Sequence, residues 1–204
     1  MSDGPIVLGL TGSIGMGKST AADMLRQLGL PVFDADAVVH KLQAPGGQAI
    51  PAIARAFPDL VTEGVLDRAR LAKRAFDAPD VLHRLEHILH PLVHEAETRF
   101  RRFAALGRRP LVVLDIPLLF ESGAERRCDY TLVVTAPPFV QKARVLKRPG
   151  MTPARFRAVL DKQMPDLEKR RRADFVIPTG AGRYHTRNAL REIVRQTRYP
   201  LGTR

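Results

Sequence analysis

The sequence predicts an α/β fold in which helices cover both faces of a five-stranded parallel sheet. Short apolar runs alternate with helical patterns along most of the chain, and this alternation produces parallel strands joined by helices. A glycine-rich turn joins the first strand to the first helix, and a long helical stretch separates the second strand from the third. We therefore expect one sheet with a helical insertion.

The first strand and helix enclose the motif Gly12-Ser13-Ile14-Gly15-Met16-Gly17-Lys18-Ser19, which fits the phosphate-binding pattern G-x-x-x-x-G-K-[ST]. The strand is expected at 6–10 and the helix at about 18–28. Glycines allow successive N–H groups to turn inward around a phosphate, and the helix N-terminus adds its positive end. Lys18 can reach the β- and γ-phosphates, and the Ser19 hydroxyl can bind Mg²⁺. Nucleotide binding is therefore predicted.

The other four strands are buried runs that are apolar on both faces, as parallel strands require, and are expected at 31–33, 111–114, 131–134 and 175–177. Further helices are expected at about 34–42 with an aspartate as N-cap, at 139–148, from Thr152 as N-cap with Pro153 as first helical residue, and at 186–198. Strands that alternate with helices in this way place their carboxyl ends at one edge of the sheet, where ligands bind.

The pattern from Pro45 to Gly107 is helical and predicts an inserted helical subdomain. Asp67 is expected to cap a helix through Phe76 that carries Arg74. Leu82, Leu85 and Leu89 mark an apolar stripe, and Phe100 and Phe103 are expected on a buried side. A helix break or kink is expected at His90-Pro91, because proline removes a backbone donor and restricts the preceding residue.

Composition excludes several classes of protein. At 204 residues, 45% hydrophobic and 26% charged, the chain resembles an ordinary globular protein, and no apolar run is long enough to span a bilayer. We expect no secretory signal before the first strand, and the single cysteine, Cys128, cannot form an internal disulfide. We therefore expect a cytoplasmic protein that does not bind membranes.

The chain carries a formal charge of +12, and its distribution is uneven. Residues 140–172 contain eleven Lys or Arg and three Asp or Glu, a balance of +8. Such a surface suits polyanionic ligands or nucleic acid. Only one aromatic residue, Phe156, interleaves these charges, which does not favour nucleic acid as a partner.

Three aspartates follow expected strands and are candidates for phosphoryl-transfer chemistry. Asp34 and Asp36 come after the second strand, where a carboxylate near the γ-phosphate can hold metal-bound water or accept a proton from an attacking hydroxyl. Asp115 follows the third strand. Whether Asp115 contacts metal or orients the substrate is left open, as is which of Asp34 and Asp115 reaches the Mg²⁺ shell.

Four histidines, His83, His87, His90 and His94, recur at helical spacing and suggest zinc. We reject that interpretation because Pro91 is expected to break the helical register, because no cysteine or tight carboxylate partner is present, and because a single helix face rarely encloses a metal.

Several segments together resemble the dephospho-coenzyme A kinases. They are the loop Gly9 to Thr20, Pro31-Val32-Phe33-Asp34-Ala35-Asp36, Leu89-His90-Pro91-Leu92, Asp115-Ile116-Pro117-Leu118-Leu119-Phe120-Glu121, Leu132-Val133-Val134, Gln163-Met164-Pro165, Glu168-Lys169-Arg170 and Ala173-Asp174-Phe175-Val176-Ile177. The similarity is collinear over nearly the whole chain. Ser13, Met16, Pro149-Gly150 and Pro178-Thr179 depart from the usual pattern, and the last departure leaves the adenine contacts open.

The resemblance implies a P-loop kinase fold with a core over 1–44 and 108–204, a lid at about 140–172 and an inserted substrate-binding domain over 45–107. It implies transfer of the ATP γ-phosphate to the 3′-hydroxyl of dephospho-coenzyme A, with Mg²⁺, by a monomer or weak homo-oligomer. Catalytic roles fall to Asp36 as general base, Lys18 and the lid arginine Arg148. The implied residue sets are Gly12, Ser13, Ile14, Gly15, Met16, Gly17, Lys18, Ser19 and Thr20 for ATP, and Asp34, Arg74, His90, Asp115, Pro117 and Leu118 for the substrate.

Three other classes of protein are weighed against this one. A GTPase switch would need an Asn-Lys-x-Asp guanine reader, but the only asparagine is Asn188 in the last helix. A nucleic-acid-associated NTPase would use the basic segment. Another small-molecule or nucleotide kinase would share the same core.

Overall fold

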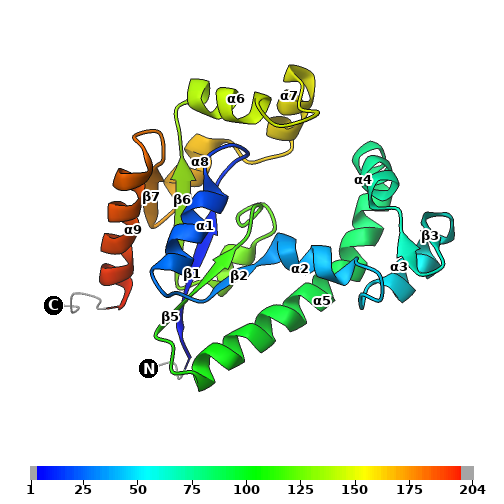
Figure 1. Ribbon diagram of the computed structural model, residues 1–204, viewed down its shortest axis with the longest axis horizontal. Helices are drawn as coiled ribbons and strands as arrows, with labels where there is room; N and C mark the ends of the chain where they lie inside the picture. Colours follow the sequence, from blue (N-terminus) through cyan, green and yellow to red (C-terminus); the bar gives the residue numbers. More distant parts are fainter. Residues whose placement is uncertain (1–3, 199–204) are drawn as a thin grey trace. The chain divides into compact units, whose positions relative to one another are not determined.

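Figure 1 shows the computed structural model of the protein, which describes residues 4–198. The chain divides into two compact units. Within the described residues, the first unit comprises 4–33 and 104–198, and the second comprises Asp34–Phe103. No helix among residues 4–198 is long and apolar enough to cross a membrane.

The first unit is built on a five-stranded sheet with the order β2-β5-β1-β6-β7. The strands are β1 (Ile6–Thr11), β2 (Val32–Asp34), β5 (Leu111–Asp115), β6 (Tyr130–Thr135) and β7 (Phe175–Pro178). The central strand β1 pairs in parallel with β5 and β6, and β6 pairs in parallel with β7. The predicted α/β fold with a five-stranded parallel sheet is confirmed.

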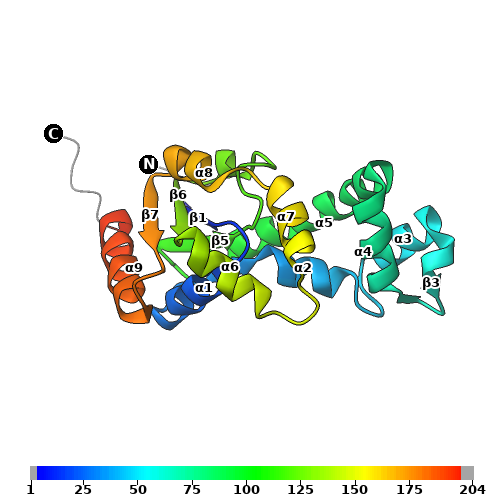
Figure 2. The ribbon, with the colours of Figure 1, turned by 90° about the horizontal axis from the view of Figure 1, so that it is seen from above.

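Helices pack on both sides of this sheet, and Figure 2 shows α1 (Lys18–Gln27) and α9 (Arg183–Arg198) on one side and α8 (Asp166–Arg172) on the other. Helices α6 (Pro138–Leu146) and α7 (Pro153–Asp161) and the short helix η2 (Ala124–Arg127) complete the unit. The core joins Leu8, Leu10 and Val134 of the sheet to Leu25 of α1 and Leu190 of α9. This packing fixes the phosphate loop, because the loop connects β1 directly to α1.

The second unit contains α2 (Ala35–Leu42), α3 (Ile50–Ala56), η1 (Pro58–Leu60), β3 (Val61–Thr62), β4 (Val65–Leu66), α4 (Arg68–Asp77) and most of α5 (Pro79–Leu106). The expectation of an all-helical insertion is wrong at β3 and β4, which form an antiparallel pair. Glu63 and Gly64 between them have φ angles of 50° and 77°. Two consecutive positive φ angles are those of a tight hairpin turn, so the dipeptide Glu-Gly turns the chain here.

Of the expected break or kink at His90-Pro91, a break is wrong, because α5 is one helix of 28 residues with Pro91 inside it. Packing of its apolar face explains this: Val81, Leu85 and Leu89 are buried in the core of the second unit. That burial outweighs the one backbone hydrogen bond that proline cannot make.

Two residues expected to be buried on the insertion's helices are exposed: Leu82 is 38% exposed and Phe103 is 67% exposed. The cap at Asp67 is confirmed, since its side chain accepts a hydrogen bond from the N–H of Arg70. Helix α8 was not expected; its acidic residues Asp166 and Glu168 stand in the first turn and its basic residues at the other end, the arrangement that a helix dipole favours.

Candidate phosphate-binding site

The loop from Gly12 to Ser19 leaves β1 and enters α1 through two residues in left-handed backbone conformation. Gly15 has a φ of 78°, and Gly17, the N-cap of α1, has a φ of 93°. Gly12 is required for a different reason, because a Cβ there would lie 2.7 Å from the carbonyl oxygen of Val134. The glycine spacing of the motif therefore follows from the geometry of the turn and its packing against β6.

Side chains from α6 and from the residue after β7 hold the far side of the loop. The Thr179 hydroxyl donates to the carbonyl oxygen of Met16 at 2.7 Å. Arg144 donates to the Thr179 hydroxyl and carbonyl oxygens, both at 2.9 Å, and Gln141 Nε2 donates to the carbonyl oxygen of Ile14 at 2.8 Å. These side chains therefore bind the carbonyl groups of Ile14 and Met16, so those two loop acceptors already have donors within the protein.

Lys18 and Asp115 form an ion pair at the carboxyl edge of the sheet. Lys18 Nζ lies 2.8 Å from Asp115 Oδ1, and the side chains are 15% and 3% exposed. An ammonium has three N–H donors, so this bond leaves Lys18 able to bind phosphate oxygens as well. The pairing places the last residue of β5 against the loop lysine, as the sequence predicts for ligands at strand ends.

The segment after Asp115 packs against α8 and the connection that precedes it. Pro117 contributes its carbonyl oxygen, which accepts a hydrogen bond from the Thr11 hydroxyl at 2.8 Å. Leu118 is 43% exposed and lies open to solvent. Glu121 Oε1 lies 2.8 Å from Lys169 Nζ, and the Lys169 side chain is fully buried.

The loop also makes a contact with the connection between α7 and α8. The N–H of Ile14 donates to Gln163 Oε1 at 3.0 Å. The residue after Gln163 is Met164, and its backbone N–H donates to Glu121 Oε1 at 2.9 Å. One short segment thus touches both the phosphate loop and the chain after Asp115.

Two residues of the predicted phosphate site are exposed: Ser19, in the first turn of α1, and Arg148, just after α6. Among residues 4–198, no cluster of three or more His, Cys, Asp or Glu side chains is arranged to hold a metal ion. The oxygen donors Ser19 and Asp115 nevertheless fit Mg²⁺, which takes few protein ligands and keeps waters and substrate phosphates in its shell.

In the second unit, Asp34 and Asp36 take different places at the start of α2. Asp34 is the N-cap, and its side chain accepts from the N–H of Ala37 at 2.9 Å. Asp36 is in the first turn and is exposed. Arg74 of α4 pairs with Asp59 at 2.9 Å, and His90 is exposed on α5.

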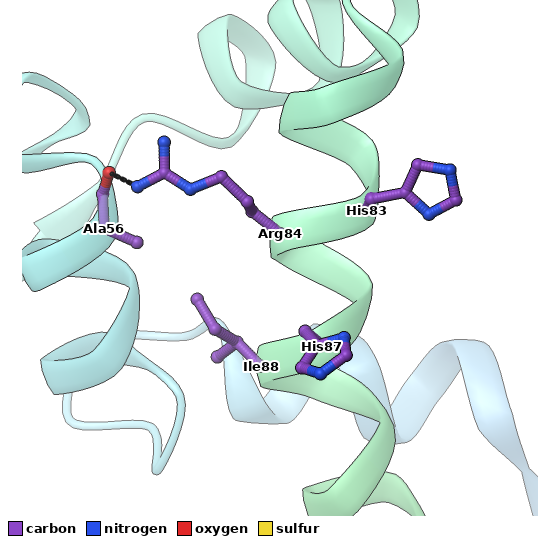
Figure 3. A pocket seen from close by; sticks show the side chains of 5 residues that line it. All are labelled: Ala56, His83, Arg84, His87 and Ile88. Atoms are coloured by element: carbon purple, nitrogen blue, oxygen red, sulfur yellow. Dashed lines mark hydrogen bonds between the residues drawn. The ribbon is translucent and has the colours of Figure 1, made fainter.

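Arg84, His83 and His87 of α5 line an open pocket of about 370 Å³ together with Ala56 and Ile88 (Figure 3). Arg84 extends toward the carbonyl oxygen of Ala56 and donates to it at 2.9 Å, whereas the ring of His83 points away from Ala56.

The continuity of α5 removes one reason given above against a histidine site. Positions i, i+4, i+7 and i+11 fall on one stripe of an unbroken helix, so His83, His87, His90 and His94 share a face, and all four are exposed. The other reasons stand: the four exposed side chains lie on a single helix face, which rarely encloses a metal, and Glu86 Oε2, at 3.8 Å from His83 Nδ1, is not a tight carboxylate partner.

Sequence reasoning did not single out Gln141 and Arg144, and it named Glu121, Gln163 and Lys169 only within segments that resemble the family, without predicting that they support the loop. Each is far from the loop along the chain. Thr179 was noted only as a departure from the family pattern. Its position directly after a buried strand was the sequence signal that could have marked it as a candidate site residue.

The sequence profile of the CoaE family, described as dephospho-CoA kinase, matches residues 6–183. The dephospho-CoA kinase of Rhodospirillum rubrum is 52% identical over 91% of this chain and 89% of its own length. That of Rhizobium meliloti is 51% identical over 93% of this chain and 96% of its own length. The crystal structure of TT1252 from Thermus thermophilus is 38% identical, with a TM-score of 0.83 and coverage of 98% of this chain and 100% of its own. The chain therefore belongs to the dephospho-CoA kinase family.

Proposed function

We propose that this protein transfers the γ-phosphate of ATP to the 3′-hydroxyl of dephospho-coenzyme A and so forms coenzyme A. The observation that carries the proposal is the glycine-rich loop with Lys18 paired to Asp115 at 2.8 Å beside it. Membership of the family supplies the acceptor. Phosphoryl transfer needs positioning and charge neutralisation more than covalent help, and this loop provides both.

Asp36 is the proposed general base, because it is an exposed carboxylate, whereas its neighbour Asp34 is engaged as a helix cap. It would accept the proton of the attacking hydroxyl. Lys18 and Arg148 would neutralise charge on the transferring phosphoryl group. Mg²⁺, held through the Ser19 hydroxyl and the ATP phosphates, would supply further neutralising charge when bound.

The substrate side is assigned to Asp34, Arg74, His90, Asp115, Pro117 and Leu118. Arg74 is paired with Asp59, but both side chains are nearly half exposed. Such a pair contributes little to stability, so Arg74 can exchange Asp59 for a substrate pyrophosphate at low cost. In this proposal residues 45–107 bind the acceptor and residues 140–172 act as a lid that excludes water. The protein would act in the cytoplasm as a monomer or weak homo-oligomer.

A coupled assay of ATP consumption tests the proposal. Purified protein is given dephospho-coenzyme A, adenosine, or a nucleoside monophosphate as acceptor. We expect turnover with dephospho-coenzyme A and a product that carries one additional 3′-phosphate by ³¹P NMR. Faster turnover with a nucleoside or nucleotide would make the protein a different small-molecule kinase. ATP hydrolysis stimulated by RNA would instead indicate a nucleic-acid-associated NTPase.

A further inference from the structure

Gln163 presents its side-chain amide to the phosphate loop in a fixed orientation. Its partner, the backbone N–H of Ile14, is a donor, so the atom 3.0 Å away must be the carboxamide oxygen Oε1. The two ends of a Gln amide are otherwise hard to tell apart, and here the hydrogen bond settles which is which. The nitrogen Nε2, with its two N–H donors, is therefore the end that does not bind the loop.

That nitrogen is available to a ligand. No hydrogen bond from Gln163 Nε2 to another residue is found within residues 4–198, and the side chain is half-buried. The loop beside it has its carbonyl oxygens of Ile14 and Met16 bound by Gln141 and Thr179. Gln163 therefore adds a donor to a site whose own acceptors are already occupied.

Gln163 is held in this position by its neighbour. The N–H of Met164 donates to Glu121 Oε1 at 2.9 Å, and the same oxygen lies 2.8 Å from the fully buried Lys169 Nζ. A buried ammonium that lost its carboxylate would be strongly destabilised, so the pair keeps Met164, and with it Gln163, in place. Glu121 thus anchors the segment through the backbone N–H of Met164, 2.9 Å from its Oε1, and this contact does not depend on the flexible Gln163 side chain.

The anchor also fixes which side of the loop Gln163 occupies. Glu121 is in the segment that follows Asp115, and Asp115 pairs with Lys18. The lysine of this motif reaches the β- and γ-phosphates. Thr179 and Arg144 approach the loop instead from the end of β7 and from α6. Gln163 is thus tied, through Met164 and Glu121, to the segment that follows the partner of Lys18.

We propose that Gln163 donates from Nε2 to the γ-phosphate of bound ATP, and so positions the phosphoryl group that is transferred and distinguishes ATP from ADP. This inference rests on the proposed function, because it requires ATP to occupy the loop. Nothing in it requires the second unit, since every contact used lies in the first unit.

Calorimetric titration of the full-length protein with ADP and with the β,γ-imido analogue of ATP tests this role. Gln163→Glu is the sharpest variant, because it has the same shape, keeps an acceptor for Ile14 and replaces the donor with a charged acceptor. Removal of a hydrogen bond to a charged group lowers affinity by about tenfold or more. We expect Gln163→Glu, which keeps the acceptor for Ile14, to weaken the analogue by about tenfold or more while ADP affinity stays within about twofold. Gln163→Met removes that acceptor as well, so it should weaken the analogue more than it weakens ADP.

Gln27→Glu is the matched control, because it makes the same chemical change at an exposed position at the end of α1. It should leave both affinities unchanged, and thermal melts verify that all variants fold.

Equal losses for ADP and the analogue would overturn the inference and leave Gln163 as a support for the loop. Tighter binding of the analogue by Gln163→Met would also overturn it, because Gln163 would then compete with phosphate. Failure of the unmodified protein to bind either nucleotide would refute the proposed function itself.

Discussion

Two aspartates separated by one residue show how little residue type alone says about a role. Asp34 ends β2 and caps α2, so its carboxylate satisfies a helix N–H that would otherwise have no partner within the helix. Asp36 lies two residues further on, in the first turn of α2, and is exposed. Asp34 therefore has a structural role as a helix cap, whereas the exposed carboxylate of Asp36 does not cap the helix. This difference is the physical basis for assigning base chemistry to Asp36.

We predict that Asp36→Asn lowers kcat by about two to four orders of magnitude, because an amide cannot accept the proton of the attacking hydroxyl. The melting temperature should change little, since the cap at Asp34 is kept. Steady-state kinetics with dephospho-coenzyme A and a thermal melt on the same sample check both parts. Near-normal kcat in a folded Asp36→Asn protein would remove Asp36 from this role.

A second prediction concerns Thr179, whose hydroxyl binds the carbonyl oxygen of Met16 inside the loop. Thr179→Val preserves shape but leaves that buried oxygen without its donor, at a cost of about 1–3 kcal/mol. We expect a lower melting temperature and weaker ATP binding by calorimetry, because the loop loses a contact that fixes its shape.

Thr131→Val is the matched control for that change. Thr131 is a buried threonine near the start of β6, and its hydroxyl donates to Asp174 at 2.7 Å, away from the loop. The two variants should both lose thermal stability, but only Thr179→Val should lose ATP affinity. Equal effects on ATP affinity would show that the loop responds to general destabilisation.

At the scale of elements, α5 is a helix that tolerates proline in its interior. Pro91 cannot donate to the carbonyl of His87, and its ring crowds that carbonyl. We predict that Pro91→Ala raises the free energy of unfolding by about 1–3 kcal/mol. Pro79→Ala is the control, because Pro79 is the first residue of α5, where a missing N–H costs nothing. Chemical denaturation checks both, and destabilisation by Pro91→Ala would contradict the prediction.

The same helix shows where sequence reasoning fails. Local signals predicted the caps at Asp67 and Thr152, because a cap needs only its own side chain and an N–H three residues on. The strands were predicted because a buried parallel strand is apolar on both faces. Pro91 was misjudged because burial along α5 decides its continuity, and burial is a property of the whole second unit.

The candidate site also has one part that local sequence predicts and another that depends on residues far apart in the chain. The phosphate loop was predicted because its glycines, Lys18 and Ser19 are contiguous in the sequence. Lys18 and Asp115 are 97 residues apart, and Ile14 and Gln163 are 149 apart. Contacts at such separations follow from strand order, which places β5 and β6 on either side of β1. No local pattern in the chain reports that order, so the contacts that support the loop could not be predicted from it.

At the scale of the whole molecule, charge is the dominant feature. Of the net charge of +12, the segment 140–172 contributes +8. Both proposed substrates are polyanions, so the protein's field should concentrate them at the site. Salt screens such attraction beyond about 10 Å at 0.1 M ionic strength. Charges near the loop should therefore matter more than equal charges elsewhere on the surface.

We predict that KM for both substrates rises with ionic strength, while kcat stays nearly constant, because screening weakens encounter and binding of the anions before it affects the enclosed reaction. Two variants that each remove one exposed positive charge separate local from global effects. The first variant is Lys147→Gln. Lys147 comes directly after α6, the helix whose Gln141 and Arg144 contact the loop. The second variant is Arg187→Gln, on α9. Initial rates measured from about 0.05 to 0.5 M KCl should show a shallower rise of KM for Lys147→Gln than for Arg187→Gln, because Lys147 follows the helix whose side chains contact the loop. Identical slopes for the two variants would show that the total charge governs capture, and a KM independent of salt would show that the basic surface does not act on the substrates.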